Sequence, residues 1–473
     1  IMKQFDKLYI NGEWVKPNST EIIEVINPAT ESPCARVPSG NREDVNAAVA
    51  SARQAFNSWA HTPAENRAAI MNAAAAEMQR RTDDLIDAHV VAMGCPRHLT
   101  AALHVDAPIE GMRYYADRAK QMEAVEEKGS VSLLKEPIGV CALINPWNYP
   151  LHQLIGKVAP ALAAGCTIVA KPAGQTPLQD FIMAEIFAAV GLPAGVFNLV
   201  SGSGSVIGPM MSSHPDVDMV SFTGSTDAGI KVAEAAAPTV KRVCQELGGK
   251  SPYIITEDAD LEAAVRYGVE DVMLNTGQTC NALTRMFVPR SRYDEAVNIA
   301  KKIAEENIVG DPNDSSVTMG PMASASQKQT VLKYIKTGIA EGARLVTGGI
   351  EMPPGLHVGA YIRPTIFADV SNKMVIAKEE IFGPVLCMIV YEDIEVAIEM
   401  ANDTVFGLAS GVYARDKASA VEIARRIRAG QCYIQGGYFN LEAPFGGYKQ
   451  SGNGREWGDQ AMHEYIETKA IIA

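Results

Sequence analysis

One cysteine of this chain has neighbours that suit chemistry as well as packing. Cys280 lies in the stretch NTGQTCNA, between small polar residues and directly after the apolar run YGVEDVML. A structural cysteine usually fills a core as a small hydrophobic side chain, whereas this one falls where a loop can turn outwards. A thiolate can attack an electrophilic carbon. Cys280 is therefore a candidate nucleophile. Other features of the sequence must distinguish that role from packing in the core.

Two glycine-containing turns could bind phosphate groups. SGSGSVIG contains Gly202 and Gly204, like the start of a G-x-G-x-x-G fingerprint, but it has Ile207 where the third glycine should be. FTGSTDAG follows the apolar run VDMVS and opens a predicted helix, in which Gly224 permits a tight turn and Ser225 can cap the first turn. Backbone N–H groups at a helix N-terminus attract anions. The pattern leaves both a dinucleotide site and a simple capped turn open.

Two further polar residues follow predicted strands. Glu246, in QELGGK, stands at the carboxyl end of a strand, where α/β folds bind ligands, although a lone glutamate there can also be a surface residue. Asn148, in INPWNYP, lies in a loop stiffened by two prolines. Its neutral amide is a donor suited to an oxyanion, and asparagine is also a common turn former.

The elements that must position these residues alternate between short apolar strands and helices. Strand-like runs such as CTIVAKP, GVFNLVSG, VDMVSFTGS and KRVCQELGG are separated by helical ones such as LQDFIMAEIFAAVG and DAGIKVAEAAAP. Strands that are apolar on both faces predict a parallel, doubly wound sheet covered by helices. The alternation starts again after Gly249, which predicts a second α/β domain. The terminal run HEYIETKAIIA predicts an edge strand that pairs either with another chain or with SVSLLKE.

Composition narrows the classes of function. The net charge is -13 with no long basic run, which argues against nucleic acid or an anionic membrane surface as a partner. No apolar run reaches the roughly 18 residues of a membrane span. The 8 histidines lie far apart and the 8 cysteines form no C-x-x-C pair, so metal binding has no support and a reducing cytoplasm is the expected location.

Seven motifs occur in succession: NPWNYP, KPAGQTP, FTGSTDAG, ELGGKS, GQTCNA, EEIFGPV and PFGGYKQSGNGRE. In this order they closely resemble the NAD(P)-dependent aldehyde dehydrogenase superfamily, over essentially the whole chain. The resemblance implies a Rossmann-like NAD(P)-binding domain (1–117 and 139–248), an α/β catalytic domain (249–450) and a small β bridging element for oligomerisation (118–138 and 451–473). A homodimer or homotetramer is expected.

The resemblance also implies an activity and its catalytic residues. An aldehyde would be oxidised to the carboxylic acid with reduction of NAD(P)⁺, through a thiohemiacetal and then a thioester on Cys280. Glu246 matches the general base that activates water, and Asn148 matches the donor that stabilises the oxyanion. Glu456 matches a second carboxylate that is sometimes assigned to a proton relay.

The same match assigns the cofactor contacts. Lys171 is expected at the adenosine ribose, Ser225 at the pyrophosphate, and Glu380 at the nicotinamide ribose with Phe382 beside the ring. The full expected cofactor set is Ile144, Pro146, Trp147, Lys171, Ala173, Gly174, Gly204, Gly224, Ser225, Gly229, Leu247, Glu380 and Phe382.

Cofactor preference and substrate choice are less strongly encoded. Relatives that prefer NAD usually have a glutamate three residues after the lysine of KPAGQTP, and this chain has Gly174 there. Losing that carboxylate removes the repulsion of a 2′-phosphate, so use of NADP⁺ is expected to be better than average. By analogy, the aldehyde tunnel is expected near Met112, Tyr149, Thr279 and Tyr438. No arginine clamp for a second carboxylate is evident, and Arg113 and Arg285 are expected to form structural pairs.

Two rival functions remain. A CoA-acylating aldehyde dehydrogenase would pass the acyl group to CoA, but such enzymes tend to lack the glutamate found here at 246. A retired enzyme that serves as a binding protein is the other rival, and the presence of Cys280, Glu246 and Asn148 argues against it.

Overall fold

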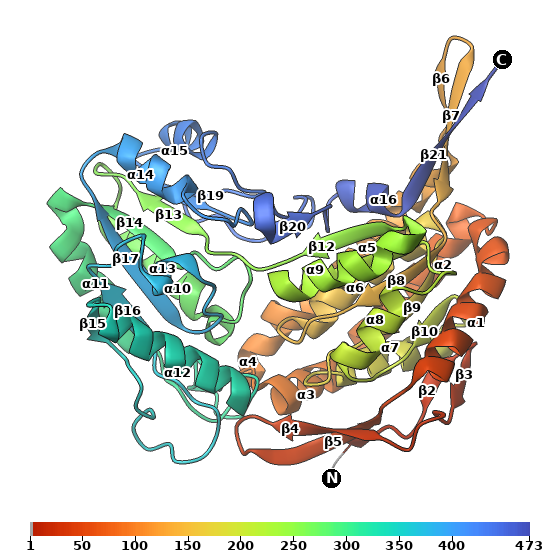
Figure 1. Ribbon diagram of the computed structural model, residues 1–473, viewed down its shortest axis with the longest axis horizontal. Helices are drawn as coiled ribbons and strands as arrows, with labels where there is room; N and C mark the ends of the chain where they lie inside the picture. Colours follow the sequence, from red (N-terminus) through yellow and green to blue (C-terminus); the bar gives the residue numbers. More distant parts are fainter. Residues whose placement is uncertain (1–2) are drawn as a thin grey trace.

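The first of two large sheets carries the N-terminal half of the chain in the computed structural model, which describes residues 3–473 (Figure 1). Its eight strands have the order β20-β12-β11-β8-β9-β10-β2-β3. The five central strands are parallel and buried, as the apolar runs predicted. They are β8 (Val140–Ile144), β9 (Thr167–Lys171), β10 (Phe197–Leu199), β11 (Met219–Thr223) and β12 (Arg242–Glu246).

Helices cover both faces of this sheet, which confirms the doubly wound architecture. Side chains of β8 alternate between two apolar clusters, with Cys141 and Leu143 in one and Val140, Ala142 and Ile144 in the other. The first cluster lies against α2 (Ala64–Arg80), α3 (Thr82–Met93), α5 (Asp106–Arg118), α6 (Pro150–Ala164) and α7 (Leu178–Ala189). The second lies against α1 (Arg42–Ala60), α8 (Gly204–Ser212) and α9 (Thr226–Ala236).

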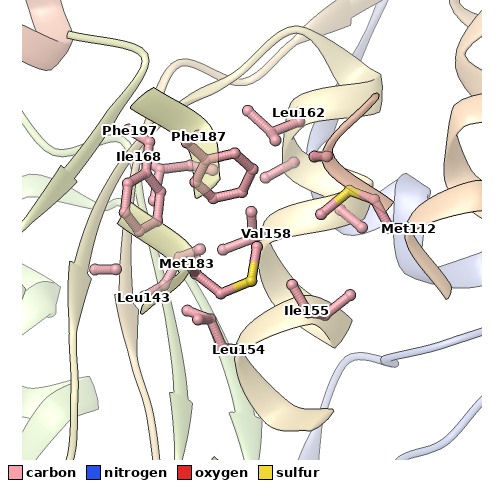
Figure 2. Packing of buried hydrophobic residues seen from close by; sticks show 14 of the residues in the cluster. Met112, Leu143, Leu154, Ile155, Val158, Leu162, Ile168, Met183, Phe187 and Phe197 are labelled. Carbon is pink, nitrogen blue, oxygen red and sulfur yellow. The ribbon is translucent and has the colours of Figure 1, made fainter. Parts of the chain in front are cut away.

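Helix α6 forms the centre of the first cluster. Nearly all of its residues are buried, because the helix is apolar around most of its circumference and packs on the sheet and on other helices. Figure 2 shows its Leu154, Ile155, Val158 and Leu162 among side chains of β8, β9, β10, α5 and α7.

The strand order creates a crevice at the carboxyl edge of the sheet. β8 lies between β9 and β11, so the chain leaves it in one direction and later returns on its other side. Ligands of open α/β sheets bind at such a reversal point. Paired residues show which strand ends meet there: Ile144 lies opposite Lys171 and Phe222, and Thr223 lies opposite Glu246.

The outer strands of this sheet are antiparallel. β2 (Leu8–Ile10) pairs with β10 and with β3 (Glu13–Val15), while β20 (Gly452–Asn453) pairs with β12. The placement of β20 differs from the expectation that residues from 451 onwards belong to the bridging element. Register explains the difference, because Gly452 pairs with Glu246 and thereby brings the following residues to the carboxyl edge of the large sheet.

A second sheet of seven strands carries the region after residue 249, as the renewed alternation predicted. Its order is β15-β16-β17-β14-β13-β18-β19, and only β15 is antiparallel to its neighbour. The strands are β13 (Pro252–Ile255), β14 (Arg285–Pro289), β15 (Arg344–Thr347), β16 (Thr365–Ala368), β17 (Val385–Tyr391), β18 (Gly411–Tyr413) and β19 (Tyr433–Ile434).

Two separate apolar clusters cover the two faces of this sheet. One contains residues of α10 (Leu261–Met273) and α11 (Tyr293–Glu305). The other contains residues of α12 (Ala325–Ala340), α13 (Val375–Lys378), α14 (Ile394–Asn402) and α15 (Lys417–Ala424). Met286 and Val288 of β14 enter the first cluster and Phe287 enters the second, as the alternation along a strand requires.

Two small sheets complete the fold. β1 (Lys3–Gln4), β4 (Ile22–Asn27) and β5 (Ser32–Pro38) form one. β6 (Glu126–Lys128), β7 (Val131–Pro137) and β21 (Ile466–Ile472) form the other, which projects from the body of the molecule (Figure 1). β21 pairs with β7 from Ile466 opposite Pro137 to Ile472 opposite Val131, so the terminal run pairs with SVSLLKE of its own chain.

Further short helices include α4 (Arg97–Thr100), a π-helical turn at Ala101–Val105 and α16 (Gln460–Glu464). Across residues 3–473, no helix combines the length and the apolar character that a membrane crossing requires.

Candidate active site

Cys280 is held by a loop with an unusual backbone. The loop follows α10, and its residues Asn275 and Thr276 adopt left-handed φ angles of 52° and 57°. Such angles are costly for residues other than glycine and persist only where surrounding contacts fix them. Here the Asn275 amide donates to the carbonyls of Asn148 (3.0 Å) and Gln278 (3.2 Å), and the Thr276 hydroxyl donates to the Gly320 carbonyl (3.1 Å). The loop before the thiol is therefore fixed.

Asn148 reaches the same loop from the other side. It lies between β8 and α6, at the crevice, and is buried. Its side-chain amide donates to the Gln278 carbonyl at 3.0 Å, two residues before Cys280. The structure thus brings together the predicted nucleophile and the predicted oxyanion donor, although they are far apart in sequence.

The environment of Cys280 favours the neutral thiol over the thiolate. Burial raises its pKa well above the ordinary value for a thiol, and the negative charges of Glu380, Glu246 and Glu456 raise it further. Only the thiolate is strongly nucleophilic. Reaction at Cys280 therefore requires the proton to leave as the sulfur attacks.

Glu246 is a buried carboxylate without a partner. Its side chain lies at the end of β12, is only 3% exposed, and neither oxygen forms a hydrogen bond within residues 3–473. Burial raises the pKa of Glu246 well above its usual range, the charge of Glu456 raises it further, and Lys157 opposes both effects. A carboxylate with raised basicity and free oxygens is suited to take a proton from water.

Glu456 forms an ion pair with a lysine that sequence reasoning missed. The Lys157 ammonium lies 2.5 Å from a Glu456 oxygen and 2.6 Å from the Thr223 hydroxyl, and its side chain is fully buried. Lys157 lies in the middle of α6, in the apolar stretch HQLIGKVAPALAA. A charged residue in such a stretch is the signal that could have identified it, because a buried charge needs a partner.

A cavity of about 440 Å³ opens onto Cys280. Tyr149, Thr279 and Tyr438 line it, as expected, and the Tyr149 hydroxyl lies 2.8 Å from that of Thr279. The other lining residues are Ala102, Leu103, Asp106, Ala107, His152, Gln153, Tyr267, Asp271, Leu274, Asn281, Tyr433, Gly437, Phe439, Phe445 and Trp457.

Met112 does not line this cavity, contrary to expectation. Its side chain is fully buried in the hydrophobic core, where Figure 2 shows it beside α6. The apolar face of α5 turns towards α6, and Met112 lies on that face. The two arginines do serve structural pairs. Arg113 forms an ion pair with Glu110, and Arg285 is buried and donates to the backbone carbonyls of Lys250, Met400 and Ala401.

The residues expected at the adenosine end gather at the carboxyl edge of the first sheet. Lys171 ends β9, beside Ala173 and Gly174, and burial lowers its pKa to about 8. A Cβ on Gly204, the first residue of α8, would lie 4.0 Å from the Lys171 nitrogen, so this glycine lies beside the Lys171 ammonium.

The two glycine-containing turns have different structures. The Ser225 hydroxyl accepts the Ala228 N–H and caps α9, and the Gly224 N–H donates to the Glu246 carbonyl. A side chain on Gly229 would collide with Leu247, so this glycine permits the close approach of α9 to the segment after β12. The other turn is not a complete fingerprint, because Ile207 is buried against Gly202 and occupies the space of the third glycine.

The residues expected at the nicotinamide end also converge. Glu380 accepts the Gly249 N–H at 3.2 Å, and burial raises its pKa to about 7. A side chain on Gly248 would overlap the second Glu380 oxygen, which has no hydrogen bond within residues 3–473. The Phe382 ring lies edge-on to Trp147 at 5.2 Å, and Ile144 and Pro146 precede that tryptophan at the end of β8.

These features fit a dinucleotide. The N-terminus of α9 offers a site for an anion. Among residues 3–473, no carboxylate is in hydrogen-bond contact with the buried Lys171 cation, and one Glu380 oxygen is free to accept ribose hydroxyls. Within residues 3–473, no group of three or more His, Cys, Asp or Glu side chains is arranged to bind a metal ion.

Comparisons with known proteins identify the family. The sequence model of the aldehyde dehydrogenase family matches residues 14–471. A 3-succinoylsemialdehyde-pyridine dehydrogenase from Pseudomonas sp. is 46% identical over 474 residues, which cover 100% of this chain and 99% of that protein.

Solved structures agree as well. A mutant form of aldehyde dehydrogenase C from Pseudomonas syringae, in complex with NAD⁺ and octanal, is 48% identical and superimposes with a TM-score of 0.98 over 99% of this chain and 96% of that chain. A Mycobacterium tuberculosis aldehyde dehydrogenase in complex with NAD⁺ is 42% identical, with a TM-score of 0.97 over 100% and 99% of the two chains. On the family match and these identities, the chain belongs to the aldehyde dehydrogenase family and is an NAD-dependent oxidoreductase that acts on aldehydes.

Proposed function

We propose that the protein oxidises an aldehyde to the free carboxylic acid by covalent catalysis at Cys280, with water as the acyl acceptor. The observation that carries this proposal is the free, buried carboxylate of Glu246 in the same site as the thiol. A carboxylate with no hydrogen-bond partner among the described residues has both oxygens available for a water molecule.

The residues divide the reaction between them. The Cys280 sulfur bonds to the aldehyde carbon, its proton passes to water in the cavity, and the Asn148 amide donates to the developing oxyanion. The dinucleotide supplies the acceptor for the hydrogen that leaves this carbon with its electron pair, and a thioester remains. Glu246 takes a proton from water, whose oxygen bonds to the acyl carbon, and the carbon–sulfur bond breaks. The net products are the acid, the reduced cofactor and one proton.

Glu456 and Lys157 set the charge around Glu246. Their ion pair is buried beside Glu246, and the two charges act on its pKa in opposite directions. We propose that Glu456 carries the proton from Glu246 onwards, which is the relay role that the family resemblance implied.

Transfer of the acyl group to CoA is the rival outcome. CoA is itself a thiol nucleophile, so a transferase has less need of a base for water. Product analysis separates the two: the hydrolytic proposal predicts free acid at the same rate with and without CoA. An acyl-CoA product, or reduction of NAD⁺ that requires CoA, would contradict it.

We also propose that the enzyme accepts NADP⁺ unusually well. Gly174 places no carboxylate where a 2′-phosphate would lie by analogy, and the buried Lys171 ammonium offers a positive charge nearby. The ratio of kcat/KM for NADP⁺ and NAD⁺ tests this, and a strong preference for NAD⁺ would refute it.

We further propose that the protein forms a homodimer or homotetramer. We also propose that it is cytoplasmic, and this location rests on the cysteine pattern alone. β21 pairs with β7 along one edge, and no strand among residues 3–473 pairs with its other edge. Such an edge is a template for a strand of a second copy.

One backbone group on that edge gives a direct test. The Ala473 N–H donates to the carbonyl of Ser130, the residue before β7, so with the alternation of a strand the Ala470 N–H points away from β7. Ala470→Pro should lower the particle mass towards the 50.7 kDa of one chain, measured by light scattering, while Ala470→Ser should not. An unchanged mass in Ala470→Pro would contradict pairing through this edge.

A further inference from the structure

The cavity at Cys280 is unusual in its charge. Two carboxylates, Asp106 and Asp271, line it, and no lysine or arginine does. The one histidine on its wall, His152, is neutral, because burial lowers its pKa to about 3. The site that receives the aldehyde is therefore negative around an apolar and aromatic lining.

Three of the four tyrosines on the wall use their hydroxyls in hydrogen bonds within the protein. The Tyr267 hydroxyl donates to the Gly437 carbonyl (2.7 Å) and the Tyr433 hydroxyl donates to Gln431 (2.6 Å). Tyr149 is hydrogen-bonded to Thr279. A ligand in the cavity therefore meets mainly their rings, and the face of an aromatic ring attracts cations.

Asp271 lies among these rings. Burial raises the pKa of each of the three tyrosines, Tyr149, Tyr267 and Tyr433, and the charge of Asp271 raises it further in each case. The charge of Cys280 also acts on Tyr149. Asp271, Tyr149 and Cys280 line the same cavity, so a substrate bound at the sulfur shares that cavity with Asp271.

Within residues 3–473, no positively charged side chain forms an ion pair with the Asp271 carboxylate. One oxygen accepts the Leu283 N–H at 2.8 Å, and the other has no hydrogen bond within residues 3–473. Burial raises its pKa to about 6, and that backbone bond is the one interaction that opposes the shift. An asparagine would accept the same N–H without the cost of burying a charge. A structural role therefore does not explain why the residue is ionisable, whereas a cation bound in the cavity would offset the cost.

We infer that the cavity selects aldehydes that carry a positive charge, such as an ammonium or quaternary ammonium group, at the end remote from the carbonyl. Asp271 supplies the counter-charge, the rings of Tyr267 and Tyr433 surround the cation, and Asp106 adds negative charge on the same wall. This inference rests on the proposed oxidation at Cys280, because it concerns the substrate of that reaction.

Three aldehydes of equal chain length test it. They are trimethylammonio-butanal, its tert-butyl isostere without charge, and the analogue that ends in a carboxylate. We expect kcat/KM to be roughly tenfold or more higher for the cation than for the neutral isostere, and lower still for the anion. Equal or better oxidation of the neutral isostere would overturn the inference and leave the proposed function standing. No oxidation of any of the three would count against the proposed function itself.

A charge-neutral variant locates the effect. In Asp271→Asn, which can keep the bond from Leu283, kcat/KM for the cation should fall at least tenfold more than that for the neutral isostere. Glu270→Gln, the adjacent exposed residue on α10, is the matched control and should leave the ratio unchanged. Equal losses for both substrates in Asp271→Asn would show a structural role and refute the assignment.

A binding measurement covers the case in which that variant folds poorly. Tetramethylammonium should inhibit the wild-type enzyme competitively against the neutral aldehyde, and Asp106→Asn should weaken this inhibition. Absence of competitive inhibition in the wild-type enzyme would contradict a cation site in the cavity.

Discussion

Replacing Glu246 by glutamine tests whether this residue acts in hydrolysis of the thioester and not in its formation. The carboxylate is buried with both oxygens unpartnered, so an isosteric amide breaks no hydrogen bond within the described residues. Burial raises the pKa of Glu246, so the folded state is penalised at pH values above the ordinary pKa of a glutamate. Removing the charge removes that penalty, and the melting temperature at neutral pH should not fall.

The rate of hydrolysis should fall steeply. A positioned general base contributes about 10²–10⁴-fold to a rate, so release of the acid in Glu246→Gln should slow by roughly that factor. In the proposed reaction the Cys280 thiol proton passes to water in the cavity, so formation of the thioester does not use Glu246. Stopped-flow absorbance of the reduced cofactor should therefore show a burst of about one equivalent per active site, followed by a slow steady phase.

Two controls sharpen the result. Hydroxylamine attacks thioesters without a general base and should restore turnover of Glu246→Gln, whereas Glu234→Gln, an exposed glutamate on α9, should behave like the wild-type enzyme. A variant with no burst, in which both phases slow equally, would refute the reasoning, because Glu246 would then act before the thioester forms. Turnover at the wild-type rate would refute it as well.

Three further changes have expected outcomes. Glu456→Gln removes a charge that raises the pKa of Glu246, so the acid limb of the kcat profile should move to lower pH; a move to higher pH would contradict the charge arrangement. Gly174→Glu should shift the kcat/KM ratio at least roughly tenfold towards NAD⁺, and an unchanged ratio would contradict the proposal. The nearest atom to a Cβ at this position is Cγ2 of Ile23 at 3.9 Å, so the substitution causes no clash at the Cβ. Asn275→Ala removes two hydrogen bonds that hold Asn148 and Gln278. The kcat should therefore fall roughly tenfold or more and the free energy of unfolding by about 1–3 kcal/mol, with KM for NAD⁺ unchanged. A wild-type kcat would show that the loop does not need these hydrogen bonds.

Much of the fold was evident in the sequence because its strands are buried on both faces. The run REDVNAAVASARQAFNSWA predicted a helix and forms α1, and VDMVS and KRVCQE form adjacent parallel strands that end side by side. The pairing of the terminal strand was open between two partners, because an apolar edge strand does not encode which neighbour it meets. The structure pairs it with residues 131–137.

The site was less accessible to sequence reasoning where it depends on the direction of a side chain. Met112 was expected in the tunnel but lies in the core, since the helical period does not tell which face of α5 meets α6. Lys157 was missed although it lies beside both glutamates, because its partners are distant in the chain. Asp271 was not predicted as a site residue, because it lies within an apolar helical run. The fold places it on the wall of the cavity.

The central claim is that the substrate bonds to Cys280. Acid-quenched Glu246→Gln enzyme, incubated with aldehyde and NAD⁺, should carry one acyl group on the peptide that contains Cys280 when analysed by mass spectrometry, and Cys280→Ala should carry none and be inactive. An adduct on any other residue, or a Cys280→Ala enzyme with full activity, would contradict the account.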